Sequence, residues 1–147
     1  MLFRSMLNRV TENWKQGKRT HIFLDEFHVV FENEYSGNFF NSAWRRFRKR
    51  NAFPTAITQN VEYLLDSVLA STMLSNSEFL VMLNQSPSDR EKLAALLNIS
   101  DEQLGYISGT EAGCGLIKYG SAIVPFVSDF PKNTELYKLM STKPNER

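Results

Sequence analysis

The stretch Thr20–His28, THIFLDEFH, decides the fold of this chain. Its apolar centre, Ile22–Leu24, runs directly into two adjacent carboxylates, Asp25 and Glu26. A continuous apolar run predicts a strand covered on both faces, as in a parallel sheet, and we expect it over Thr20–Phe27. Ligands of open α/β sheets bind beyond the carboxyl ends of such strands, so two acids at this position favour metal and water chemistry on a nucleotide. A strand that ends in a solvated acidic turn is the simpler alternative.

The composition is that of one globular domain. The 147 residues are 42% hydrophobic and 22% charged, with a net charge of +1, so the chain can bury a core and has no general attraction to nucleic acid or membranes. We expect residues 1–147 to form a single domain. The single cysteine, Cys114, excludes an internal disulfide framework and a cysteine zinc site. Without a run of ~20 apolar residues or a signal peptide, the sequence predicts a cytoplasmic protein.

Helices are predicted on both sides of this strand. Apolar residues at helical spacing predict a first helix that ends near Gly17, and a second helix from about Asn38 to Arg50 after a loop over Asn33–Asn38. The next strand is expected over Thr55–Thr58, with Pro54 at its start, because proline is unfavourable inside a strand. Strand, helix and strand in this order predict a parallel βαβ unit.

The second half of the chain continues the α/β pattern. We expect helical pieces over Val61–Leu69 and Ala70–Ser75, followed by a third apolar strand over Glu78–Leu83. Two further helices are expected over Asp89–Leu97 and 101–107. A hairpin of Glu111–Lys118 with Ser121–Val127 and a last short helix over Thr134–Met140 complete the chain. The predicted class is therefore α/β, with parallel strands, flanking helices and a C-terminal β-hairpin.

Asp25, Glu26 and Gln59 are the residues best placed for chemistry. If the two strands are parallel, all three side chains emerge at the same edge of the sheet. The acids could then hold a Mg²⁺ shell and polarise a water, because Mg²⁺ prefers oxygen ligands and keeps several waters. The glutamine could hydrogen-bond a phosphate or that water. Taken alone, Gln59 is more simply a loop amide; the joint pattern is far more specific.

A basic cluster ends the second predicted helix: Arg45, Arg46, Arg48, Lys49 and Arg50. For most of these side chains the simplest interpretation is a solvated face that complements the helix dipole. One of them could instead be an arginine finger that stabilises charge on a transferring phosphate, often across a subunit interface. The cluster could also follow a nucleic-acid backbone.

The two histidines and the cysteine give weaker evidence for a catalytic or metal-binding role. His21 and His28 have no cysteine partners, so a zinc site is not favoured. His21 is expected to be a packed or capping residue, whereas His28, next to the acids, could help to shape the site. The sequence offers no evident histidine or acid partner for Cys114, which disfavours a catalytic thiol. Its flanking glycines, Gly113 and Gly115, indicate a bulge or a close backbone approach.

These motifs resemble a known family. HIFLDEFH resembles a Walker B strand, and RRFRKRNAFPTAITQN resembles the stretch that follows it in VirB-type motors of conjugal transfer and type IV secretion, relatives of the HerA and FtsK DNA-pumping ATPases. FLVMLNQ and GLIKYGSAIVPF also fit the family pattern. The resemblance covers nearly the whole chain, from about Leu7 to Pro144, and implies a partial RecA-like P-loop NTPase fold that uses ATP and Mg²⁺.

The resemblance also implies roles for individual residues. Asp25 would act on Mg²⁺ through water, Glu26 would be the base that positions the attacking water, and Gln59 would sense the γ-phosphate. One of the basic residues would reach a nucleotide, with Arg48 and Lys49 the best matches and Arg45 and Arg50 as further candidates. Such motors work as homo-hexamers at the cytoplasmic face of a membrane-embedded secretion channel, together with other channel components, and some contact DNA.

The sequence departs from the family pattern at one point. No G-x-x-x-x-G-K-[ST] loop occurs in the 147 residues, although this loop supplies the amides, the lysine and the hydroxyl that hold phosphate and Mg²⁺. The chain is thus expected to be the C-terminal portion of an ATPase domain, inactive alone. In this class of fold the phosphate-loop strand lies in the sheet between the Thr55–Thr58 strand and the Glu78–Leu83 strand. We therefore expect either a gap in the sheet at that place, or direct pairing of Glu78–Leu83 with Thr55–Thr58. A nucleic-acid-binding module using helix 45–50 and a catalytically dead interaction domain are the alternatives.

Overall fold

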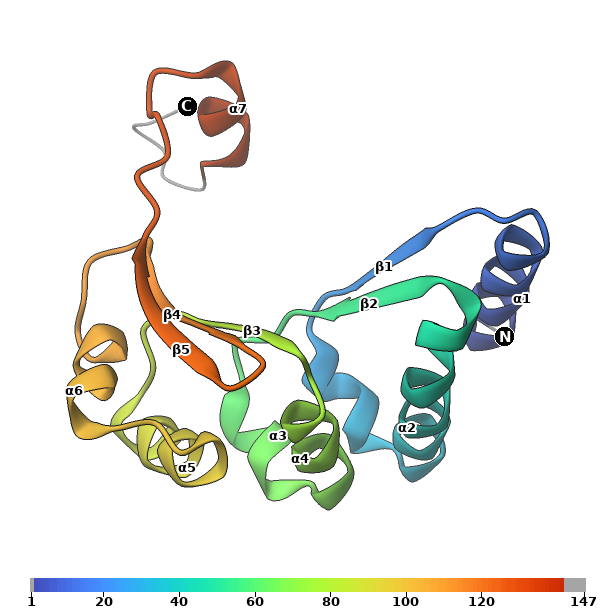
Figure 1. The fold of residues 1–147 in the computed structure, drawn as a ribbon, viewed down its shortest axis with the longest axis horizontal. Coiled ribbons are helices and arrows are strands. Elements are labelled where there is room, and N and C mark those ends of the chain that lie inside the picture. Colours follow the sequence, from blue (N-terminus) through green and yellow to red (C-terminus); the bar gives the residue numbers. More distant parts are fainter. Residues whose placement is uncertain (1, 142–147) are drawn as a thin grey trace. The chain divides into compact units, whose positions relative to one another are not determined.

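A computed structural model describes residues 2–141 of the chain. The fold is mixed α/β, and its contacts divide it into two compact units, Met1–Ser77 and Glu78–Arg147 (Figure 1). The first unit contains a parallel sheet and the second an antiparallel one. The single domain expected over 1–147 stays a prediction.

The first unit is built around a parallel βαβ unit, as predicted. Strands β1 and β2 pair in parallel, from Thr20 opposite Ala52 to Leu24 opposite Ala56. Its elements are α1 (Leu2–Lys15), β1 (Thr20–Leu24), the 3-10 helix η1 (Phe27–Glu32), α2 (Glu34–Phe47), the 3-10 turn η2 (Arg48–Arg50), β2 (Ala52–Ala56), α3 (Val61–Asp66) and α4 (Val68–Ser75).

One face of the parallel sheet carries the core. Helices α1 and α2 both pack against it, through the buried side chains of Val10, Ile22, Ala43, Phe47 and Ala52. On the opposite face Phe23 is 70% exposed. The expectation of a strand covered on both faces is therefore wrong for the residues that the structure describes, because both helices of this sheet occupy the same side.

Two predicted boundaries are also wrong. The strand ends at Leu24, not at Phe27, because residues from Phe27 onward turn into η1. The loop expected over Asn33–Asn38 is the first turn of α2, since the Asn33 side chain accepts hydrogen bonds from the backbone N–H groups of residues 35 and 36. An asparagine at this position satisfies amides that a helix start leaves unpaired, and this local bond favours a helix over an open loop.

Pro54 lies inside β2, opposite Ile22, and not at its start. The Asn51 carbonyl accepts from Thr20 N–H, and Ile57 N–H donates to the Leu24 carbonyl. Because backbone groups alternate along a strand, the odd-numbered residues of β2 face β1 and Pro54 faces away. Its missing N–H thus costs no bond to β1, which is how proline is accommodated at a strand edge.

The second unit pairs three strands in the order β3–β4–β5, all antiparallel. Its elements are β3 (Phe79–Met82), α5 (Pro87–Leu97), α6 (Asp101–Leu104), η3 (Gly105–Ile107), β4 (Cys114–Tyr119), β5 (Ala122–Val127) and α7 (Glu135–Met140). The predicted hairpin is present, and its two-residue turn begins with Gly120 at a φ of 57°. The side chains of Ser86 and Ser100 cap the starts of α5 and α6.

The strand predicted over Glu78–Leu83 forms, but its partner was not foreseen. β3 pairs with β4, and β2 pairs with β1. The closure of Glu78–Leu83 onto Thr55–Thr58 would join the two units, and it stays a prediction. The gap in the sheet next to β2 also stays a prediction.

Candidate functional site

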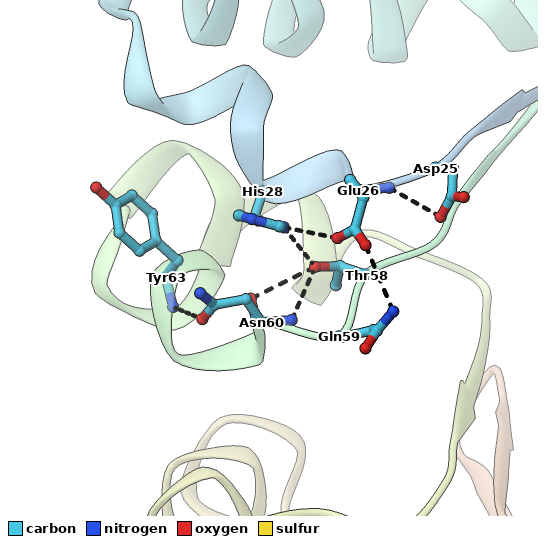
Figure 2. Close-up of polar contacts among 7 residues, drawn as sticks. All are labelled: Asp25, Glu26, His28, Thr58, Gln59, Asn60 and Tyr63. Atoms are coloured by element: carbon cyan, nitrogen blue, oxygen red, sulfur yellow. Dashed lines mark hydrogen bonds and ion pairs between the residues drawn. The ribbon is translucent and has the colours of Figure 1, made fainter.

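The candidate site lies where β1 and β2 end. Asp25 and Glu26 directly follow β1, and Gln59 comes three residues after β2. Gln59 Nε2 donates to Glu26 Oε1 at 3.4 Å (Figure 2). The structure thus brings together the acidic pair and the glutamine, 33 positions apart in the sequence. An interaction domain with these side chains scattered in space is disfavoured.

Backbone hydrogen bonds hold the two turns of the site side by side. Ile57 N–H donates to the Leu24 carbonyl at 2.8 Å, and the Ile57 carbonyl accepts from Phe27 N–H at 2.9 Å. These bonds continue the parallel ladder past the last paired residues of both strands. The position of Glu26 against Gln59 is consequently set by the sheet register.

Glu26 has an unusual backbone. Its φ of 48° and ψ of 46° are left-handed, and it caps the start of η1. The other described residues with positive φ, glycines aside, are Asn51 and Asn98, and asparagine adopts this conformation far more readily than glutamate. Asp25 Oδ1 accepts the Glu26 N–H at 2.9 Å and so stabilises the turn. Strain of this kind is concentrated at functional sites.

Two further side chains complete the cluster. His28 Nδ1 lies 3.4 Å from Glu26 Oε2 and 3.1 Å from Thr58 Oγ1 (Figure 2). The sequence placed His28 near the acids but did not show that η1 turns it back onto them, and Thr58 was overlooked. The available signal was Thr58-Gln59-Asn60, whose threonine accepts the Asn60 N–H at 3.1 Å, a local turn typical of threonine.

The basic residues lie at the other end of the strands. Arg48 and Lys49, in η2, come just before β2, whose five residues span about 16 Å at ~3.3 Å each. Both side chains are exposed, as is Arg45, whereas Arg50 Nη1 donates to Thr11 Oγ1 at 2.9 Å. The structure therefore does not bring the four candidate cations to the acids of the same chain.

The donor set at the site fits Mg²⁺ and a phosphate ligand. Asp25 and Glu26 are exposed carboxylates next to an amide, and hard oxygen ligands with room for water are what Mg²⁺ prefers. No group of three His, Cys, Asp or Glu side chains that could enclose a metal is found among residues 2–141. Asp25, whose Oδ1 accepts the Glu26 N–H, would hold such an ion through water.

Comparisons with known proteins support the fold. No protein-family model and no curated protein matches the sequence. Among solved structures, the chain is similar to VirB4 of Thermoanaerobacter pseudethanolicus, with a TM-score of 0.71 and 23% sequence identity. The match covers 77% of this chain and 31% of the VirB4 chain. The likeness is one of fold, over about a third of the VirB4 chain.

In the part of the chain that the structure describes, no helix is long and apolar enough to cross a membrane.

Proposed function

We propose that this chain carries the water-activating part of an ATP-hydrolysing site in a VirB-type motor of conjugal transfer and type IV secretion. The observation that carries the proposal is the meeting of Asp25, Glu26 and Gln59 at the carboxyl edge of β1 and β2. The fold likeness to VirB4 agrees with the family that the sequence resembles. A partial RecA-like fold that supplies the Walker B strand and the glutamine sensor accounts for both.

Each residue then has a chemical role. Asp25 would hold Mg²⁺ through a water of its shell, and the bound ion would supply charge neutralisation at the phosphate. Glu26 orients the attacking water and accepts its proton. Gln59, whose Nε2 now donates to Glu26, is placed to hydrogen-bond the γ-phosphate or the same water. These 147 residues contain no phosphate-binding loop, so the proposed hydrolysis requires one from another segment.

The proposal is tested by restoring the loop. Joined at its N-terminus to a segment that carries a phosphate loop, the chain is expected to release phosphate from ATP in a Mg²⁺-dependent reaction. The chain alone is expected to show no release above background. Phosphate release measured with Mg²⁺ and with EDTA decides the matter. A joined protein that folds but does not hydrolyse ATP would contradict the proposal, as would equal hydrolysis by the chain alone.

In the complete protein we propose a homo-hexamer at the cytoplasmic face of the cell membrane, with other secretion-channel components as partners and DNA as a possible cargo. Because η2 lies at the far end of β2 from Glu26, the finger acts on the nucleotide of a neighbouring subunit. Arg48 and Lys49, both exposed, are the preferred residues for this role. Arg50 is a weaker candidate because it is tied to Thr11.

This arrangement predicts complementation between two inactive variants. In a joined protein, Arg48→Ala and Glu26→Gln are each expected to remove hydrolysis. Mixed in one ring, they should recover part of it, because a subunit with Glu26 intact then lies beside a neighbour with Arg48 intact. Hydrolysis is measured across mixing ratios, with Arg46→Ala, exposed on α2, as the control that stays active. Mixed rings without any recovery would place the finger in the same subunit or elsewhere.

A nucleic-acid-binding role is a second candidate, favoured by the exposure of Arg45, Arg46, Arg48 and Lys49 within five positions. If these side chains contact phosphates, log affinity for duplex DNA should fall against log salt with a slope of about −0.9 per contact, or about −3.6 for all four. Fluorescence anisotropy over a salt series measures this slope. Replacing the four cations by glutamine should flatten it, and salt-independent binding would exclude the role.

A further inference from the structure

His28 has no role in the hydrolysis proposed above, although it lies against the proposed base. Its side chain is 18% exposed, whereas that of Glu26 is 49% exposed. Its Nδ1 is 3.4 Å from Glu26 Oε2 and 3.1 Å from Thr58 Oγ1, so one ring nitrogen faces both turns of the site (Figure 2). Tyr63 lies on the other side of the imidazole, with ring centroids 6.3 Å apart.

The surroundings of Nδ1 show which nitrogen carries the proton. An ionised carboxylate only accepts hydrogen bonds, so a bare Nδ1 facing Glu26 Oε2 would be repelled. The Thr58 oxygen accepts the Asn60 N–H at 3.1 Å, and its own O–H points to the Asn60 carbonyl at 3.5 Å. A hydroxyl oxygen has two lone pairs, so it can accept a second bond, from His28. We therefore assign the proton to Nδ1, where Glu26 and Thr58 share it.

We propose that His28 is a positioning residue that holds the Glu26 carboxylate for water activation, a role that rests on the function proposed above. Gln59 Nε2 donates to one carboxylate oxygen and His28 Nδ1–H faces the other. An exposed glutamate otherwise samples several rotamers, and a base out of line by about 1 Å can lose ~10²-fold in rate. Thr58 links His28 to the turn that presents Gln59, so the base and the sensor are held as one unit.

The contact itself is tested on the 147-residue chain without any hydrolysis. The chain has two histidines, and His21, which stacks on Phe53 with ring centroids 5.4 Å apart, is an internal reference. Imidazole ¹⁵N shifts at a pH where both rings are neutral report their tautomers. We expect the Nδ1–H form for His28, lost when Glu26→Ala and Thr58→Val are combined. An Nε2–H form of His28 in the unsubstituted chain would overturn the proposal.

The consequence for catalysis is tested in the protein joined to a phosphate loop. His28→Phe keeps an aromatic ring but removes the donor, and kcat should fall by about 10- to 100-fold with KM unchanged. His28→Asn, whose amide can occupy the position of Nδ1, should restore most of the loss, and His21→Phe should change neither constant. Full activity of His28→Phe, or no rescue by a folded His28→Asn, would overturn this proposal alone. A parent protein without hydrolysis would instead refute the proposed function.

Discussion

Replacing Glu26 with glutamine is expected to stop ATP hydrolysis in the joined protein while leaving nucleotide bound. Glutamine has the same shape and can still meet Gln59, but it cannot accept a proton from water. Loss of a positioned general base typically costs about 10²- to 10⁴-fold in rate. Because the change acts on the chemical step, kcat should fall and the affinity for a fluorescent ATP analogue should stay the same.

The control for this variant is Glu32→Gln, which makes the same change of charge at an exposed position at the end of η1. Its hydrolysis rate should equal that of the parent. Thermal unfolding of both variants checks that the left-handed turn at position 26 is kept, since glutamine carries the same backbone strain as glutamate. Normal turnover by Glu26→Gln would remove Glu26 as the base, whatever the nucleotide affinity.

The contact between Glu26 and Gln59 was predictable because it depends on few unknowns. Parallel pairing across a βαβ unit puts the carboxyl ends of two consecutive strands at one edge. The helical spacing of apolar residues predicted α2, which buries Phe40, Ala43 and Phe47 and leaves Trp44 partly exposed. Each of these features follows from the regular spacing of apolar residues along the chain. The predicted hairpin follows in the same way from its alternation and from Gly120.

Other features depend on contacts between elements, which the spacing of apolar residues does not specify. Phe23 is exposed because α1 and α2 pack on the other face, a choice that the apolar run Ile22–Leu24 does not specify. His28 meets Glu26 because η1 is a 3-10 turn, which begins with a strained residue that no propensity predicts. Asn33 was assigned to a loop because asparagine serves loops and helix caps equally well.

Replacement of Gly115 by alanine has the clearest expected effect on stability. It is buried in β4, opposite Phe126 on β5. A Cβ at this position would overlap the Met82 carbonyl oxygen of β3 and come within 2.9 Å of the Phe126 ring. The ring can turn away, but the carbonyl belongs to the paired backbone of β3 and cannot move without breaking the ladder. This is the close backbone approach that the glycines beside Cys114 indicated.

Gly115→Ala is therefore expected to destabilise the second unit by about 2 kcal/mol, since overpacking of this kind costs ~1–3 kcal/mol. That loss should speed amide hydrogen exchange in β4 by about 30-fold where exchange follows unfolding of this unit. Both tryptophans, Trp14 and Trp44, lie in the first unit, so their fluorescence in urea reports that unit separately.

Gly105→Ala is the matched control, because a Cβ there meets nothing within 4 Å and Gly105 has a helical φ of −53°. Alanine at such a position should leave stability unchanged or raise it by about 0.4–1 kcal/mol, since it restricts the unfolded chain. The two variants add the same methyl group, so any difference in β4 exchange reports the packing against Met82. Equal exchange rates in the two variants would show that β3 can yield at Met82, and that glycine is not required at position 115.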